Sequence, residues 1–352
     1  MAIKITGVGS YIPTKVTPNQ AFESNEFYNE DGTRFDADNK IIIKKFKSIT
    51  GIDERCYVED HFNNSDIGAF ASKKALEDAN LDPEELDYII LAQNYGDVKH
   101  GSNQSDMVPS IATRVKQKLG IKNPKSVAYD VMFGCPGWIE GVIQAYAFMK
   151  AEMAEKCLVV GSETLSRVVD TNDRDSMIFS DGAGAVVLEK TDGEGGILAH
   201  ESATFAYEEA DYIYFGESFN KKRTDGTRYI KMLGRKIYEF ALNNVPNAMK
   251  SCLDKASVDI KDVKKILIHQ ANEKMDEAIV KRFYKLFGLE MPEHIMPMSI
   301  DYLGNSSVAT VPTLYDLILK GELENHQINE GDVIIFASVG AGMNINAIVY
   351  KV

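Results

Sequence analysis

ALEDANLDPEELDYIILAQ, residues 75–93, has an echo 177 residues further along the chain, in CLDKASVDIKDVKKILIHQ, residues 252–270. Each copy has the pattern of a helix end, an acidic turn and a buried strand. Four residues of the first copy recur at the same place in the second, namely Leu76 as Leu253, Ala79 as Ala256, Asp82 as Asp259 and Gln93 as Gln270. Because the spacing is close to half of the 352 residues, we expect two related halves, residues 1–190 and 191–352. Chance similarity between two helix-turn-strand units is the alternative explanation.

Apolar strand-like runs alternate with helix-length segments along the whole chain. The expected strands are YIILAQN (88–94), SVAYDVM (126–132), CLVVGSE (157–163), AGAVVLEK (183–190), KILIHQ (265–270), DVIIFASVG (332–340) and AIVYKV (347–352). Such alternation is typical of an α/β architecture. An acidic, glycine-containing stretch near residues 190–205 is the expected junction between the halves.

The composition restricts the classes of function. A formal net charge of −13 argues against broad nucleic-acid binding, which needs a basic face. No apolar run reaches the ~18 residues of a membrane span, and the first residues lack the apolar middle region of a secretion signal. We therefore expect a cytoplasmic protein. The four cysteines lack the spacing of a zinc site or of a disulfide framework, so we expect no metal site of this kind. We also expect no cofactor.

The stretch VMFGCPGWIEG, residues 131–141, places a cysteine in a tight turn between a predicted strand and a predicted helix. Proline is favoured at the first helical position, so Pro136 is expected there and Cys135 is expected as the cap. The positive end of a helix lowers the pKa of a thiol, and the flanking Gly134 and Gly137 allow a substrate to approach the backbone. A nucleophile and a buried core cysteine are both compatible with this pattern.

Two further polar residues follow predicted elements at places where a partner for the thiol could lie. His269 ends the strand KILI and precedes a predicted helix, residues 271–288. Asn305 follows Gly304 at the end of a strand-like run and precedes the helix-like SSVATVPTLYDLIL. Taken alone, a strand-end histidine is more often a hydrogen-bonded structural residue, and an asparagine at such a place is often a cap or turn residue.

Taken together, these stretches resemble the ketoacyl synthase III family of the thiolase-like superfamily, the condensing enzymes that start fatty-acid and related polyketide chains. The resemblance covers nearly the whole chain. Its segments are ITGIDER (49–55), the Cys135 turn, VVGSETLSR (159–167), DRDSMIFSDGAGAVVLE (173–189), IHQANEK (268–274), YLGNSS (302–307) and SVGAGMNINA (338–347).

The resemblance implies a fold of two pseudo-symmetric halves in five layers, α-β-α-β-α, and a homodimer. It also implies that Cys135, His269 and Asn305 form a catalytic triad. Cys135 would accept an acyl group from an acyl-CoA or acyl-carrier-protein primer, and the backbone amides of Cys135 and Ala341 would hold the oxyanion. His269 and Asn305 would then assist decarboxylative condensation with malonyl-acyl carrier protein. Family docking positions for the acidic carrier protein fall on Lys274, Lys281 and Arg282.

The basic residues of this acidic chain gather in two spans. Residues 261–285 hold seven Lys and Arg against four acids, and residues 221–236 hold seven against the single Asp225. A basic patch beside an active site would attract an acidic carrier protein. An ordinary solvated helix face is the alternative for each span.

The sequence departs from the family pattern around the substrate. Lys45 and Ile49 stand where relatives that use CoA primers have a tryptophan and an arginine, while Arg174 keeps the other side of the adenine clamp. Val108 replaces a bulky phenylalanine in the acyl pocket, and Phe133 stands where small residues are common. These departures leave open a specialised ketosynthase or acyltransferase of secondary metabolism, of resorcinol, pigment or polyketide type, that uses longer or carrier-bound acyl groups.

Three other classes of function fit the sequence less well. A nucleotide-binding oxidoreductase is excluded because VGAGMN lacks the third glycine and only ten residues follow Gly342. A cysteine hydrolase of G-x-C-x-G type would need a glycine where Phe133 stands. A non-catalytic partner subunit would be expected to have lost Cys135, His269 or Asn305, and all three are present.

Overall fold

The computed structural model describes all 352 residues, and its first sheet has five strands. In spatial order these are β1 (Ala2–Tyr11), β7 (Asp181–Thr191), β6 (Lys156–Thr164), β4 (Tyr88–Ala92) and β5 (Val127–Val131). β7 pairs antiparallel with both β1 and β6, whereas β4 pairs parallel with both β6 and β5. The parallel strands β6, β4 and β5 all end at the edge of the sheet where the Cys135 turn begins, as expected for a site at the carboxyl ends of parallel strands.

The second sheet has four strands. Their order is β11 (Val263–Ile268), β12 (Val333–Gly340), β13 (Asn344–Lys351) and β8 (Gly196–Thr204). β11 and β12 are parallel, and the other neighbours are antiparallel. The chain crosses from the first sheet to the second between Thr191 and Gly196, beside the junction expected near residue 190. The origin of the two halves, residues 1–190 and 191–352, by duplication stays a prediction.

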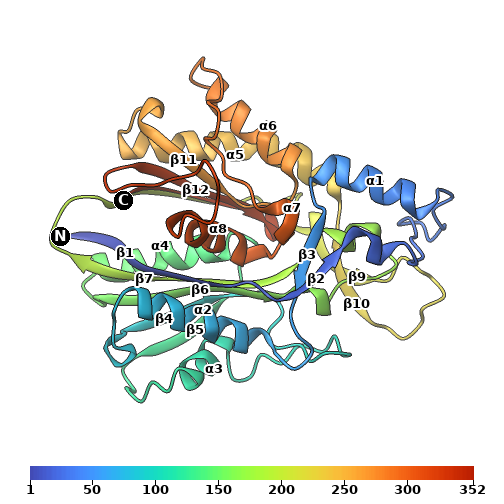
Figure 1. Cartoon of the computed structure of the whole chain (residues 1–352), viewed down its shortest axis with the longest axis horizontal. Coiled ribbons are helices and arrows are strands. Elements are labelled where there is room, and N and C mark those ends of the chain that lie inside the picture. The colour runs from blue at the N-terminus through green and yellow to red at the C-terminus, as the bar shows by residue number, and fades with distance from the viewer.

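Helices form three layers around the two sheets, which confirms the expected α-β-α-β-α arrangement (Figure 1). α4 (Gly137–Lys150) and α8 (Thr310–Leu319) lie between the sheets. α2 (Asn64–Asp78) and α3 (Ile111–Lys118) cover the outer face of the first sheet. α5 (Gly234–Ala256) covers the second sheet, and α6 (Glu273–Lys285) packs beside it.

The central layer is the largest buried cluster of the protein, and aromatic side chains join its two sides. Trp138 of α4 and Tyr315 of α8 both make edge-to-face contacts with Phe336 of β12. A helix that packs against a sheet on each side has no polar face, which explains why every residue of α8 from Thr310 to Ile318 is buried. This packing fixes the position of the start of α4 relative to the start of α8, and therefore also the positions of the residues around them.

The repeated segments adopt the same local structure in the two halves. Each runs from the end of a helix, α2 or α5, through a short 3-10 helix to a strand, β4 or β11. Asp82 caps the first 3-10 helix by accepting a hydrogen bond from the amide of Glu84, and Asp259 caps the second by accepting one from Lys261. The aspartate is therefore repeated because each copy needs an oxygen acceptor at the same backbone position.

All seven predicted strands are present, but six others were not predicted from the sequence. They are β1, β8, β2 (Lys15–Pro18), β3 (Glu54–Tyr57) and the hairpin of β9 (Ile213–Glu217) and β10 (Arg228–Met232). In β1, Gly7 and Gly9 lie so close to α2 that a Cβ atom would be 2.3 Å and 2.5 Å from backbone atoms of Ala75. Glycines at such closely packed positions interrupt the alternation of apolar and polar residues by which a strand is recognised in the sequence. Two further α-helices, α1 (Asn39–Thr50) and α7 (Ile300–Leu303), complete the fold, and no helix has the length and apolar character to cross a membrane.

Candidate active site

The Cys135 turn joins β5 to α4, as the sequence predicts, but the helix begins one residue later than expected. Pro136 is the N-cap and Gly137 is the first helical residue, so Cys135 precedes the cap. Gly134 has a φ of +68°, and its carbonyl accepts a hydrogen bond of 2.9 Å from the Gly137 amide. Glycine is favoured at this position because left-handed backbone is costly for other residues.

His269 directly follows β11, and its backbone continues the parallel ladder by donating to the Ala337 carbonyl at 2.8 Å. Its Nδ1 lies 2.7 Å from Thr310 Oγ1, and that hydroxyl donates to the Ser307 carbonyl at 2.9 Å. Because a hydroxyl has one hydrogen, this arrangement makes Nδ1–H the donor and leaves Nε2 as a free acceptor. Burial lowers the pKa of the imidazole to about 4, so the ring is neutral at pH 7.

Asn305 follows α7, so the expectation that a strand precedes it is wrong. The four residues IDYL form one helical turn that ends at Gly304, whose φ is +67°. The backbone of Asn305 then pairs with the first half of the chain, donating to Ile178 and accepting from Ser180. Its side-chain Oδ1 accepts a hydrogen bond of 2.7 Å from the Ser307 amide. The NH2 group of Asn305 is therefore free to donate into the cavity.

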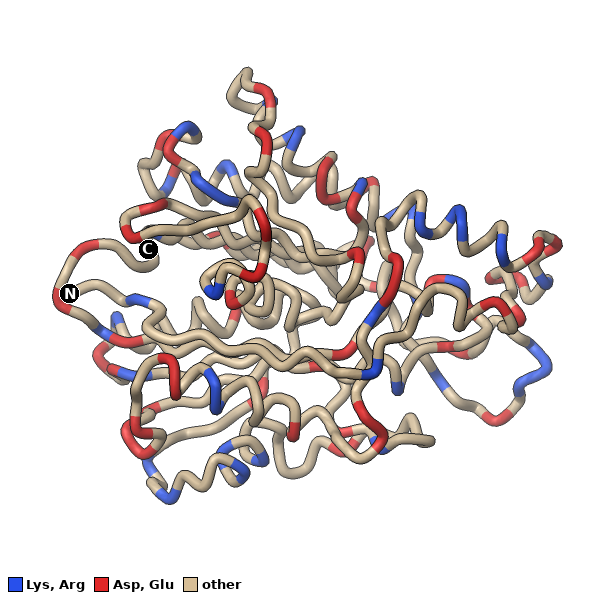
Figure 2. Tube along the Cα trace, viewed as in Figure 1, with Lys and Arg blue, Asp and Glu red and all other residues tan.

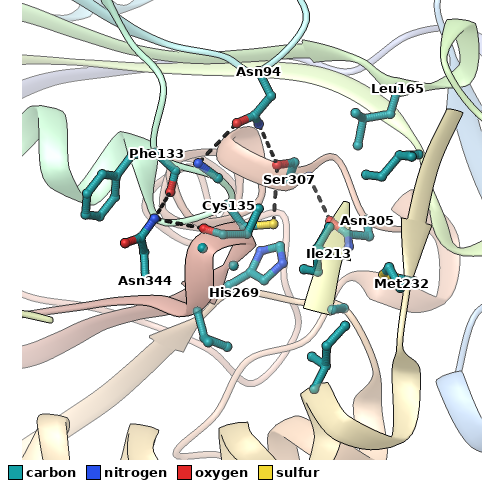
Figure 3. A pocket seen from close by; sticks show the side chains of 18 of the residues that line it. Asn94, Phe133, Cys135, Leu165, Ile213, Met232, His269, Asn305, Ser307 and Asn344 are labelled. Atoms are coloured by element: carbon teal, nitrogen blue, oxygen red, sulfur yellow. Dashed lines mark hydrogen bonds between the residues drawn. The ribbon is translucent and has the colours of Figure 1, made fainter. Parts of the chain in front are cut away.

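One cavity of about 360 Å³ is lined by Cys135, His269 and Asn305 together, although the first comes from one half and the other two come from the other half. Figure 3 shows the sulfur of Cys135 directed toward the imidazole, with Asn305 beside them. Of the 24 residues that line the cavity, 16 are hydrophobic. A largely apolar cavity with a few convergent polar groups is the usual form of a small-molecule site.

The pKa of Cys135 differs from the expectation based on the helix end. Burial raises it to about 11, and the charge of Glu163 acts in the same direction. The Ser307 hydroxyl, which donates to the sulfur at 3.4 Å, acts against this rise. The prediction of a lowered pKa is therefore wrong, because desolvation of the thiol outweighs the effect of the helix end. The resting pair is a neutral thiol and a neutral imidazole.

The two backbone amides expected to hold an oxyanion lie on two stretches of backbone that contact each other. A Cβ atom on Gly134 would be 2.7 Å from the Ala341 nitrogen, and one on Gly340 would be 2.5 Å from the Cys135 nitrogen. Only glycine permits this contact between the Cys135 turn and the end of β12. Ala341 also lines the cavity, so both amides are available at its wall.

The apolar wall of the cavity comes in large part from the β9–β10 hairpin, which the sequence analysis missed. Ile213, Phe215, Ile230 and Met232 of this hairpin line the cavity. Lys231, between the last two, is fully buried and pairs with Asp170 and Asp173, so it anchors the hairpin and does not belong to the expected surface patch. The alternation of RYIKM is a strand signal that could have been found.

The two residues expected in the acyl pocket lie in different surroundings. Phe133 lines the cavity, whereas Val108 lies before a cis proline, is 86% exposed and does not line it. Within a single chain Val108 therefore has no part in the acyl pocket, and its expected role there stays a prediction.

A second cavity of about 450 Å³ adjoins the first, since Met232 lines both. Lys45, Ile49 and Arg174 lie in its wall. The three positions that correspond to the CoA-contacting residues of the family are therefore close together. The guanidinium of Arg174 lies 5.7 Å from the ring centre of Phe35, within the range of a cation–π contact. Phe35, in an irregular segment before α1, thus supplies an aromatic ring that the sequence analysis did not identify.

The three expected docking residues are exposed on α6. Lys281 pairs with Glu277 one helical turn earlier, and Arg282 donates to Asn243 of α5 at 2.9 Å. Lys274 lies in the first turn of α6, close in sequence to the cavity residues Ala271 and Met275. No group of three or more His, Cys, Asp or Glu side chains is arranged to hold a metal ion.

Comparison with known proteins agrees with this geometry. Residues 129–204 match the 3-oxoacyl-[acyl-carrier-protein] synthase III model, and residues 253–352 match its C-terminal model. β-Ketoacyl-[acyl-carrier-protein] synthase III 1 of Bacillus cereus is 30% identical over 352 residues, covering 100% of this chain and 99% of that protein. The synthase III of Ruegeria pomeroyi is 31% identical over 354 residues, covering 99% and 98%. The chain belongs to the 3-oxoacyl-[acyl-carrier-protein] synthase III family.

A solved structure supports the same conclusion. The 3-oxoacyl-[acyl-carrier-protein] synthase III of Aquifex aeolicus has a TM-score of 0.82 and 29% identity, with full coverage of both chains. The protein is thus an acyl-transferring condensing enzyme with a thiolase-like fold, as the sequence predicts. The specialised ketosynthase of secondary metabolism is not favoured by these relatives.

We expect His269 to remain neutral well below pH 6. Its folded-state pKa lies below the ordinary value, so the folded protein binds fewer protons than the unfolded chain between about pH 4 and pH 6.5. The His269 contribution to stability is complete above this window and is lost as the pH falls through it. Nitrogen-15 NMR of the imidazole, assigned by its absence in His269→Gln, checks this. An imidazolium spectrum at pH 6 would contradict the assignment of a desolvated neutral ring.

Proposed function

We propose that Cys135, His269 and Asn305 are the catalytic residues of a two-step β-ketoacyl synthase III reaction. An acyl group passes from a thioester primer to Cys135, and the acyl-enzyme then condenses with malonyl-acyl carrier protein with loss of CO2. The single observation that supports this is the convergence of the three side chains, from both halves of the chain, on one apolar cavity.

In the acyl transfer, the neutral His269 Nε2 takes the proton of the Cys135 thiol as the sulfur attacks the thioester carbonyl. The carbonyl oxygen becomes an oxyanion, which the amides of Cys135 and Ala341 stabilise. Collapse of this intermediate breaks the bond to the departing thiol, which takes the proton back from Nε2. Dividing the reaction through an acyl-cysteine replaces one difficult step by two easier ones.

In the condensation, the malonyl thioester loses CO2 and its enolate attacks the acyl-cysteine carbonyl. The bond from that carbonyl to Cys135 then breaks, and the released thiolate takes up a proton to restore the thiol. The free NH2 of Asn305 is placed to donate to the enolate oxygen, because its Oδ1 is occupied by the Ser307 amide. His269 can donate beside it when Thr310 turns its hydroxyl toward Nδ1, since the proton then resides on Nε2. Thr310 therefore accommodates both tautomers that the two steps need.

The carrier protein is proposed to dock on the basic surface beside the second cavity. Figure 2 shows Lys and Arg gathered along α1 and in the loop of residues 221–228, on the side of the molecule where α6 begins. Lys44, Lys45 and Lys274 are exposed there. An acidic carrier would be attracted to this surface over distances of about a Debye length, ~8–10 Å. The cavity of Phe35 and Arg174 would receive the phosphopantetheine arm or the nucleotide of a CoA primer.

The enzyme is proposed to act as a homodimer. β5 is an edge strand of the first sheet, and the nearby Val127, Met132 and Val108 are exposed apolar residues. An open edge strand with apolar neighbours is a surface that proteins usually cover. Pairing of this edge in two copies would bury all three residues.

We expect Asn305→Ala to separate the two steps. Acylation of Cys135 should proceed at a rate within a few-fold of wild type, whereas condensation should fall by at least ~100-fold, as after loss of an oxyanion-type donor. Intact-mass spectrometry of the variant with an acyl-CoA and an acyl-carrier donor measures the first step, and product formation with malonyl-acyl carrier protein measures the second. Failure to acylate would refute this division of roles.

We expect Lys274→Glu to raise the KM for malonyl-acyl carrier protein several-fold with little change in kcat, because a rim charge affects encounter more than chemistry. The effect should diminish as salt is added. Lys125→Glu, at an exposed position before β5, is the matched control with the same charge change. An equal effect of both variants would show that net charge and not docking is responsible.

Light scattering on the purified protein should give twice the chain mass of 39.1 kDa. Val127→Glu, which places a charge on the edge strand, is expected to weaken this dimer, with Lys125→Glu again as the control. A monomer at micromolar concentration that still acylates Cys135 would contradict the dimer proposal and leave the chemistry intact.

A further inference from the structure

A chain of hydrogen bonds runs from a buried carboxyl group to the Cys135 sulfur, and the roles assigned above do not use it. Asn94 Nδ2 donates to Glu163 Oε1 at 2.6 Å and to Ser307 Oγ at 3.4 Å. The Ser307 hydroxyl donates in turn to Cys135 Sγ at 3.4 Å. Figure 3 shows Asn94 and Ser307 on the opposite side of the sulfur from His269. The sulfur thus has a hydrogen-bonded hydroxyl on one side and the imidazole on the other.

The direction of each hydrogen bond is fixed by the groups available. Asn94 Oδ1 accepts from the Gly134 amide at 3.1 Å, so the NH2 end of Asn94 faces Glu163 and Ser307. Ser307 Oγ therefore receives a hydrogen from Asn94, and its own single hydrogen points to the sulfur. Because Asn94 also holds the Gly134 amide, one side chain sets the position of both the Cys135 turn and the hydroxyl.

Ser307 is held in an unusual conformation. Its φ is +53°, in the left-handed region, where a residue other than glycine is strained. The Ser307 amide donates to Asn305 Oδ1, and its carbonyl accepts from Thr310, so both backbone groups are tied to residues of the site. The side chain is 4% exposed. Strain of this kind persists only where surrounding contacts enforce it, and here it directs the hydroxyl at the nucleophile.

Glu163 is the buried carboxyl group at the end of this series of hydrogen bonds. It is 1% exposed and has no Lys or Arg within ion-pair distance. Burial raises the pKa of its carboxyl to about 8, so at neutral pH the group is largely uncharged and serves as an acceptor for Asn94. At neutral pH the carboxyl therefore places little negative charge near the Cys135 sulfur, whereas above about pH 8 its charge raises the pKa of the thiol.

We propose that Ser307 is a further catalytic residue, whose hydroxyl stabilises the Cys135 thiolate, and that Asn94, anchored by Glu163, is its positioning residue. The inference rests on the proposed role of Cys135 as nucleophile. In the step itself the thiol proton passes to His269 Nε2 while Ser307 keeps its own hydrogen and donates it to the sulfur. The sulfur lone pair then forms the new bond to the acyl carbon, and the carrier thiol leaves with the proton from Nε2.

The test compares Ser307→Ala and Ser307→Gly with wild type. Glycine accepts the left-handed backbone and so removes the hydroxyl without strain, which guards against a folding defect of the alanine variant. The rate at which iodoacetamide alkylates Cys135 is measured from pH 6 to pH 11 by mass spectrometry of its peptide. We expect the rate at each pH below the midpoint to fall by about tenfold in both variants, because a hydrogen bond to a charged group is worth about tenfold or more. Acylation from acyl-CoA at pH 7 should fall by about tenfold.

Ser306→Ala is the matched control, since Ser306 is a buried neighbour that does not line the cavity. Its alkylation profile should match wild type. Asn94→Leu should reproduce part of this fall in rate, and Glu163→Gln, which keeps an acceptor for Asn94, should leave the alkylation rate at pH 7 unchanged. Superimposed profiles of wild type and both Ser307 variants would overturn the inference. A wild-type Cys135 that is alkylated but never acylated would instead refute the proposed function.

Discussion

The site depends on the direct contact between two stretches of backbone, the Cys135 turn and the end of β12. Gly134 lies against Ala341 and Gly340 lies against Cys135, so closely that a methyl group on either glycine would be 2.7 Å or less from the opposite backbone. This contact joins the first half of the chain to the second and brings the Cys135 and Ala341 amides to one wall of the cavity. The buried aromatic contacts of Phe336 with Trp138 and Tyr315, in the central layer, stabilise this contact between the two halves.

Burial also determines the charge state of the site. It raises the pKa of the Cys135 thiol to about 11 and lowers that of the His269 imidazole to about 4, so the resting pair is uncharged. Charge then forms only when a substrate is bound, at the moment when backbone amides, Asn305 and the Ser307 hydroxyl can stabilise it. Donors that are fixed before the reaction stabilise such charge without the cost of reorganising solvent. The mainly apolar lining of the cavity fits this purpose.

Much of the fold could be predicted from the sequence because its strands are buried on both faces. Continuous apolar runs such as those of β6 and β12 are distinctive, and the repeated Asp82 and Asp259 mark equivalent turns. β1 was missed because its glycines serve a close approach to α2, and the β9–β10 hairpin was missed because its anchor, Lys231, looks like a surface residue. The roles of Asn94, Ser307 and Phe35 could not be predicted, since they depend on contacts between residues up to 213 positions apart.

The chain has four free cysteines, and we assign acyl transfer to one of them, Cys135. Cys56, Cys157 and Cys252 are buried and do not line the cavity, whereas Cys135 faces it. The most direct measurement is peptide mapping of the protein after a short exposure to acyl-CoA and acyl-carrier donors. The account predicts a single acyl group on Cys135 that malonyl-acyl carrier protein removes as product. Acylation at another cysteine, or an acyl group on Cys135 that malonyl-acyl carrier protein never discharges, would contradict it.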